Sequence, residues 1–195
     1  MKMPFKLFLV FFLCCASLAI AQNKYEREFR IRKSQFPEKA IALIKEKLEG
    51  AKRLKFYKEI DSLKSSFEAK FKKDRLWYSV EFDENGVLED IEILIKPIDV
   101  PTDTFGEIEN FLKRKFSKYR IKRLQQQYPT SEDELLEETV KKAFQNLIVP
   151  SVNYEIIVSG KNEKGHLDYE ILFDAQGEFV KLRQSLPPNY DHVLY

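Results

Sequence analysis

The clearest alternation of hydrophobic and polar positions runs through residues 76–83, which read Leu-Trp-Tyr-Ser-Val-Glu-Phe-Asp. From Tyr78 onward every second residue is aromatic or aliphatic, which is typical of a strand with one buried face. Asp83 then suits the first position of a turn, and Gly86 suits its last position, where a left-handed residue starts the return strand. The pattern predicts a β-hairpin over residues 76–94.

The same pattern returns 91 positions later, in residues 167–177. Both stretches fit the sequence Leu-x-Tyr-x-aliphatic-x-Phe-Asp-x-x-Gly. A second hairpin is therefore expected over residues 167–184. Repetition at a fixed offset indicates that the chain consists of two copies of one hairpin-bearing unit.

Helical and strand patterns around the first hairpin define a unit over residues 36–101. A helix is expected whose first turn contains Pro37, where the missing N–H of proline is not needed. Short alternating stretches at 52–59 and 65–73 predict two more strands. The unit therefore reads as one helix followed by four antiparallel strands.

The second unit is expected over residues 102–186, starting with a helix capped by Thr102 or Asp103. It carries an insertion at 131–149, in which apolar residues recur at helical spacing. Residues 187–195 are read as a tail. We therefore expect an α+β fold of two tandem units, each a helix packed on an antiparallel sheet of about four strands. An extra helix is expected in the second unit.

Residues 1–21 carry the pattern of an export signal. Two lysines precede an apolar run, and a small-x-small sequence predicts cleavage after Ala21, with Gln22 as the new N-terminus. A retained membrane anchor is the alternative, but the run is short for a span of about 20 residues. We expect a periplasmic or secreted protein with a flexible N-terminus over residues 22–35.

Removal of this segment changes the composition of the chain. The segment contains both cysteines and two of the 33 lysines and arginines, but none of the 31 acidic residues. The remaining chain has no net charge, which argues against nucleic-acid binding. Without cysteine it has no disulfide, thiolate metal ligand or thiol nucleophile. We expect no membrane association after cleavage, and the sequence leaves the oligomeric state open.

No set of residues in the sequence predicts a reaction or a cofactor. His166 and His192 have no neighbouring Cys or His that would complete a zinc site. The turn after Asp83 has too few oxygen ligands for a calcium loop. We therefore expect a protein that is not an enzyme and has no catalytic, cofactor-binding or metal site. A hydrolase with an unrecognised carboxylate site and a carrier of a small apolar ligand are the alternatives.

Trp77, the one tryptophan of the chain, shares its predicted face with Ser79 and Glu81. A helix covers one face of such a sheet, and the other face must be polar or contact another molecule. An aromatic residue in a polar field is typical of protein interfaces. These three residues are therefore candidate contacts with another exported protein. The alternative is that the two units touch at this face.

Residues 36–186 resemble the PepSY-like proteins exported by bacteria, a family also described as beta-lactamase-inhibitor-like. The resemblance is carried by the Phe36-Pro37 helix start, the short strands that follow, and the hairpin motif from Tyr78 to Gly86. The second copy has the hairpin motif but no Phe-Pro start. The resemblance implies an exported, non-enzymatic binding domain that binds or inhibits a secreted or periplasmic enzyme such as a peptidase.

Overall fold

The computed structural model describes residues 22–24, 26–61, 64–163 and 165–185, and these form a single sheet of ten strands. The strands are β1 (Gln22–Lys24), β2 (Glu26–Ile31), β3 (Lys52–Asp61), β4 (Lys64–Lys73), β5 (Leu76–Asp83), β6 (Leu88–Leu94), β7 (Tyr119–Pro129), β8 (Asn153–Asn162), β9 (Gly165–Phe173) and β10 (Phe179–Ser185). The α-helices are α2 (Glu38–Ile44), α3 (Thr102–Lys115) and α4 (Leu136–Phe144). Short 3-10 turns are η2 (Lys33–Gln35), η3 (Lys45–Leu48) and η4 (Pro97–Asp99).

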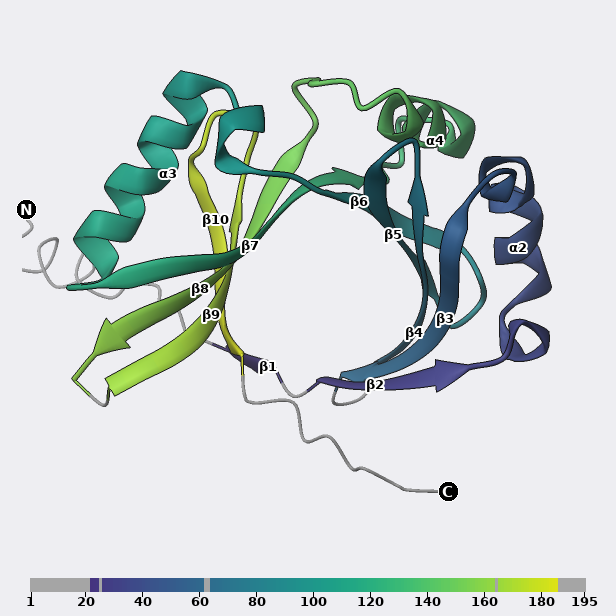
Figure 1. The fold of residues 1–195 in the computed structure, drawn as a ribbon, viewed down its shortest axis with the longest axis horizontal. Coiled ribbons are helices and arrows are strands. Elements are labelled where there is room, and N and C mark those ends of the chain that lie inside the picture. Colours follow the sequence, from purple (N-terminus) through teal and green to yellow (C-terminus); the bar gives the residue numbers. More distant parts are fainter. Residues whose placement is uncertain (1–21, 25, 62–63, 164, 186–195) are drawn as a thin grey trace, which may run out of the picture.

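The sheet curls until its two ends approach each other. The strand order is β1-β10-β9-β8-β7-β6-β5-β4-β3-β2, so the edge strands β1 and β2 are consecutive in the chain. Only the β1–β10 pair is parallel among the described strands. On the inner side, Arg183 of β10 lies 3.6 Å from Asp61 of β3 and links the two ends. Figure 1 shows the resulting ring, with the three helices on its convex side.

Both predicted hairpins are confirmed, but the predicted division into two helix-on-sheet units is wrong. β6 pairs with β7, with Ile91 opposite Tyr128, and this pairing makes one continuous sheet. The helix inserted in the second half also packs on the first half, because Phe144 of α4 stacks on Tyr78 of β5 at 4.8 Å between ring centroids. Alternation along a strand identifies its faces but not the strand that pairs with its edge.

The two hairpin turns have the same geometry. Asp83 Oδ1 accepts hydrogen bonds from the backbone N–H groups of Asn85 at 2.9 Å and Val87 at 2.8 Å. Asp174 Oδ1 accepts the equivalent bonds from the second and fourth residues after it, at 2.9 and 2.8 Å. A Cβ atom on Gly86 (φ 72°) would lie 2.8 Å from Pro37 Cβ at the start of α2. Each turn therefore needs glycine both for its backbone and to dock against a helix.

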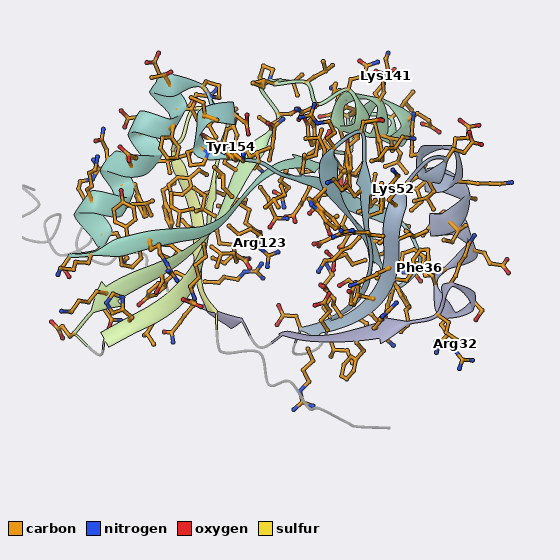
Figure 2. All side chains as sticks on the ribbon, viewed as in Figure 1. Arg32, Phe36, Lys52, Arg123, Lys141 and Tyr154 are labelled. Atoms are coloured by element: carbon orange, nitrogen blue, oxygen red, sulfur yellow. The ribbon has the colours of Figure 1, made fainter. Side chains whose placement is uncertain are left out.

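The hydrophobic core lies between the convex face of the sheet and the helices. Figure 2 shows Phe36 near α2 and Tyr154 on the side of α3, both within this layer. Ile108 and Leu112 of α3 are fully buried. Burial of each such side chain stabilises the fold by about 1.5–3 kcal/mol. The core residues that the sheet supplies include Phe71, Val80, Phe82, Ile91, Ile93, Ile156, Ile171 and Phe173.

Two predictions about the ends of elements differ from the structure. Others concern residues that the structure does not describe. The expected flexible N-terminus over 22–35 is wrong, because β1, β2 and η2 fall within this range. Their regular backbone pairing with β10 and β3 was not apparent from their charged sequence. The helix predicted to be capped by Thr102 or Asp103 has Pro101 at its N-cap position instead. Residues 1–21 and 187–195 lie outside the described residues, so cleavage between Ala21 and Gln22 stays a prediction.

Candidate functional site

The concave face of the sheet is lined by polar side chains. On β5, Tyr78, Val80 and Phe82 face the core, whereas Trp77, Ser79 and Glu81 face the concave side. All three helices of the described chain lie on the opposite side (Figure 1). The acidic residues of the concave face include Glu28, Glu59, Glu68, Glu81, Asp90, Glu92, Glu155 and Glu170.

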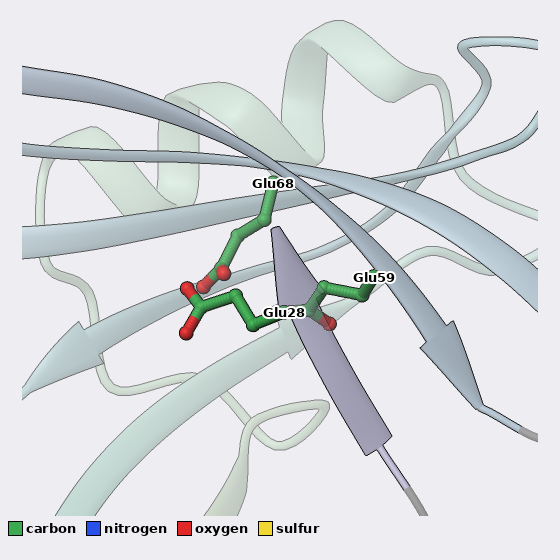
Figure 3. A group of neighbouring side chains, drawn as sticks. All are labelled: Glu28, Glu59 and Glu68. Atoms are coloured by element: carbon green, nitrogen blue, oxygen red, sulfur yellow. The ribbon is translucent and has the colours of Figure 1, made fainter. Parts of the chain in front are cut away.

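A first cluster of carboxylates joins β2, β3 and β4. Glu28, Glu59 and Glu68 each place a carboxylate oxygen within 4.8 Å of the others. Figure 3 shows the carboxylates of Glu28 and Glu68 turned toward each other. The ammonium of Lys70 lies between them, at 2.8 Å from Glu28 Oε1 and 2.7 Å from Glu68 Oε2. This internal cation offsets the negative charge that a metal ion would otherwise neutralise.

Lys70 stays charged in this cluster. Burial by itself would lower the pKa of Lys70, but the carboxylates of Glu68 and Glu28 raise it above its ordinary value. Ser79 Oγ donates a hydrogen bond to Glu68 Oε1, and Glu68 is only 3% exposed. The cluster is therefore a packed polar network that holds β2, β4 and β5 together.

A second cluster of carboxylates joins β5 and β6. Glu81, Asp90 and Glu92 also place oxygens within 4.8 Å of one another. Gln127 Nε2 donates to Asp90 Oδ2 at 3.1 Å, and Gln125 Nε2 donates to Glu92 Oε2. Asp90 Oδ1 is buried and has no hydrogen-bond partner among the described residues. In this cluster the hydrogen-bond donors to the carboxyl groups are thus neutral glutamine amides, whereas in the first cluster the donor is the charged ammonium of Lys70.

Two acids of the second cluster, Asp90 and Glu92, have pKa values raised toward the protonated form. Burial, together with the nearby carboxylates of Glu155 and Glu89, raises the pKa of Asp90 to about 8. Burial and Glu155 also raise the pKa of Glu92 well above its ordinary value. A protonated carboxyl group needs no cation to offset its charge. Both clusters can contribute oxygen ligands to a metal ion, but each already has a way to limit its charge.

The open end of the concave face carries Trp77. The guanidinium carbon of Arg53 lies 5.5 Å from the centroid of the Trp77 ring, and Lys72 Nζ lies 5.8 Å from it. Tyr78 is opposite Ile93, so the register continued by one residue places Leu94 opposite Trp77. Leu94 is 43% exposed and Trp77 is partly exposed. This end of the concave face therefore presents an apolar pair to solvent.

The three residues predicted as partner contacts share a face, but they have different environments. Ser79 is 6% exposed and bonded to Glu68, so it offers little contact area. Glu81 belongs to the second carboxylate cluster. Trp77 remains accessible. The alternative that two separate units touch at this face is wrong, because the pairing of β6 with β7 makes the two halves one continuous sheet.

The remaining candidates from the sequence are the two histidines and a pocket for a small apolar ligand. His166 is exposed at the start of β9, and His192 lies outside the described residues. A shallow, open pocket of about 550 Å³ beside the start of α3 has a mixed polar and apolar lining that includes Asp103, Glu107 and Asn110, whereas sites for small apolar ligands are concave and lined mainly by apolar side chains. Among the described residues no helix has the length and apolar character to span a membrane.

The sequence did not reveal the carboxylate clusters or the position of Arg53. The carboxylates come from five strands, and only the strand register brings them together. Arg53 lies in a bulge between Lys52 and Lys55, so simple alternation assigns it to no face. The sequence did predict one feature of the site, because the alternation along β5 places Trp77 on the face that points away from the core.

No protein-family model matches the chain, and no curated protein matches it. Solved structures with a similar fold come from Bacteroides species. A DUF2874 family protein from Bacteroides ovatus has 11% identity over 76% of this chain and 87% of its own, with a TM-score of 0.51. A Bacteroides eggerthii protein, provisionally described as periplasmic, has 15% identity over 76% of this chain and 88% of its own, with a TM-score of 0.51.

A BLIP-like (beta-lactamase-inhibitor-like) protein from Bacteroides fragilis has 14% identity over 80% of this chain and 92% of its own, with a TM-score of 0.49. At such identities the likeness to the Bacteroides ovatus and Bacteroides eggerthii structures shows the fold alone. One of the three is thus described as BLIP-like, whereas none is described as PepSY-like or as a tandem repeat.

Proposed function

We propose that this protein is an exported, non-enzymatic binding module that binds another exported protein through the open end of its concave sheet face. The observation that carries the proposal is that Leu94 is exposed and Trp77 is partly exposed on a sheet face over which no helix of the described residues lies. Solvent-facing aromatic residues at the edge of a polar field are typical anchors of protein interfaces. The proposal includes the PepSY-like relationship expected from the sequence. A secreted peptidase is one candidate partner.

Export is supported by two independent observations. Residues 1–21 have the charged start, apolar run and small-residue cleavage pattern of a signal segment. The similar structure from Bacteroides eggerthii is provisionally described as periplasmic. The periplasm or the extracellular space is therefore the proposed location, and the partner would be a protein of the same compartment.

The environment of the carboxylates supports binding over hydrolysis. A general acid with a raised pKa must reach its substrate within hydrogen-bond distance. Glu92 is only 5% exposed, and Asp90 Oδ1 is shielded from solvent. Glu68 is held by Ser79 and Lys70. These acids are therefore better suited to holding neighbouring strands together than to attacking a substrate.

Site-specific crosslinking tests the proposal. A photoreactive residue replaces Leu94, and a matched control carries it at Lys113, which is exposed on α3 on the convex side. Both proteins are irradiated in the exported fraction of the producing cell. We expect the Leu94 probe to capture one protein that the Lys113 probe does not, and the purified proteins to bind each other. Identical products from both positions would contradict the proposal.

If the captured protein is a peptidase, its activity provides the next measurement. The wild-type protein should inhibit it. Trp77→Ala should weaken inhibition by about thirty-fold or more, since aromatic anchors of an interface contribute at least about 2 kcal/mol to binding.

A further inference from the structure

Four cationic residues lie at the end of the concave face that carries Trp77, two of them over its ring and two more on β3. Arg53 and Lys72 lie over its ring, at 5.5 and 5.8 Å from the centroid. Lys52 is opposite Lys72 in the strand register, and Lys55 is opposite Lys70. Lys72 is in turn opposite Trp77 itself. We call the group of Lys52, Arg53, Lys55, Lys72 and Trp77 the basic-aromatic end.

The backbone is shaped to place Arg53 at this end. The register of β3 against β4 shifts between Lys52 and Lys55, which marks a β-bulge. Arg53 has a φ of 58°, in the left-handed region that residues other than glycine rarely adopt. Bulges re-aim side chains and are common beside functional sites. Here the bulge brings the guanidinium of Arg53 over the ring of Trp77.

The four cations have no acidic partner among the described residues. Lys52, Arg53, Lys55 and Lys72 make no ion pair there. The contrast with Lys70 is direct, because this residue lies on the same strand and face, two positions before Lys72, and is paired with both Glu28 and Glu68. The concave face thus changes from internally paired charge to unpaired positive charge at Trp77.

We propose that the basic-aromatic end binds a carboxylate-rich peptide segment of the partner, which deepens and rests on the proposed binding function. The guanidinium fork of Arg53 matches a carboxylate in bidentate geometry. The lysines supply attraction without a fixed direction, and Trp77 with Leu94 supplies an apolar platform for the peptide chain. Deeper in the concave face Lys70 is already paired with Glu28 and Glu68, so the cations left to bind an acidic segment lie at this end.

Trp77 makes the test direct, because it is the one tryptophan of the chain and reports binding through its own fluorescence. The full chain without its first 21 residues is titrated with a hexaglutamate peptide at low salt. Hexaglutamine is the neutral control, and polygalacturonate is an anionic polysaccharide. We expect a saturable change with hexaglutamate, none with hexaglutamine, and weaker binding at high salt because exposed charges are screened.

Variants identify the residues responsible. Arg53→Gln and Lys72→Gln should each raise the half-saturating hexaglutamate concentration by about three- to five-fold, as expected for one exposed ion pair. Lys113→Gln makes the same charge change on α3 and should leave it unchanged. Thermal unfolding of each variant checks that the fold is retained.

Three outcomes would overturn the inference: no response to hexaglutamate, an equal effect of Lys113→Gln, or a response to polygalacturonate alone, which would mark a polysaccharide site. Capture of a partner by the Leu94 probe does not depend on these titrations. If capture succeeds and hexaglutamate does not bind, the binding function stands and the acidic character of the partner is wrong.

Discussion

At the scale of single residues, Asp90 and Lys70 show two solutions to the same problem of buried charge. Lys70 remains charged because two carboxylates surround it. Asp90 has a glutamine partner and a pKa raised to about 8, so it holds a proton at neutral pH. Sequence reasoning could place Glu81 on the concave face, but it could not find its neighbours Asp90 and Glu92, because the register between β5 and β6 is not encoded locally.

The raised pKa of Asp90 makes stability depend on pH. The native state binds a proton that the unfolded state releases above its ordinary pKa of 3.8, so the free energy of unfolding falls as pH rises from about 4 to about 8. One such proton contributes a slope of up to about 1.4 kcal/mol per pH unit. Asp90→Asn keeps an acceptor for Gln127 and removes this proton. We expect a smaller slope in urea unfolding between pH 5 and pH 9.

Asp133→Asn is the matched control for this measurement, because Asp133 is exposed in the loop before α4. It should leave the slope unchanged, while Glu92 retains part of the pH dependence in both variants. A slope that Asp90→Asn does not reduce would show that Asp90 is already ionised in the native protein.

At the scale of secondary-structure elements, local signals predicted the strands and hairpins but not their assembly. Tyr78 and its alternating neighbours mark β5 because burial on one face repeats every second residue. The pairing of β6 with β7 and the packing of Phe144 on Tyr78 join segments that are distant in sequence. No local pattern records such contacts, so the sheet was interpreted as two. The charged sequence of β2 likewise gives no local signal for a strand, because its place in the sheet depends on pairing with β3.

The docking of each hairpin turn on a helix leads to a prediction at Gly177. Its φ is 84°, and an added Cβ would lie 2.4 Å from the carbonyl oxygen of Thr104 in α3. Gly177→Ala combines a strained backbone with a backbone clash, and we expect a loss of about 1–3 kcal/mol in the free energy of unfolding. Gly106→Ala lies in α3 with nothing within 4 Å of the added Cβ. It should stabilise the helix by up to about 1 kcal/mol.

Chemical denaturation of both glycine variants provides the measurement. Equal effects at the two positions would show that the turn moves away from α3 without cost, and the proposed docking role of Gly177 would then be wrong.

At the scale of the whole molecule, the ring brings together two ends of one sheet, and short N-terminal strands complete both edges. β1 pairs with β10, and β2 pairs with β3 over the six residue pairs from Glu26–Asp61 to Ile31–Phe56. Arg183 and Asp61 add a contact across the same junction. The concave face, with its carboxylate clusters and Trp77, exists only because the sheet curls in this way.

This closure predicts a graded response to truncation from the N-terminus. A chain starting at Glu26 lacks β1 and leaves the short edge of β10 open, so it should unfold at a slightly lower temperature than a chain starting at Gln22. A chain starting at Lys33 also lacks β2, which removes the ladder along β3 and the contact between Glu28 and Lys70. Thermal unfolding should show a much larger loss for this chain, and light scattering should show self-association, because an open strand edge pairs with other chains. Equal stability of all three chains would mean that β3 and β10 hold the curvature without the N-terminal strands.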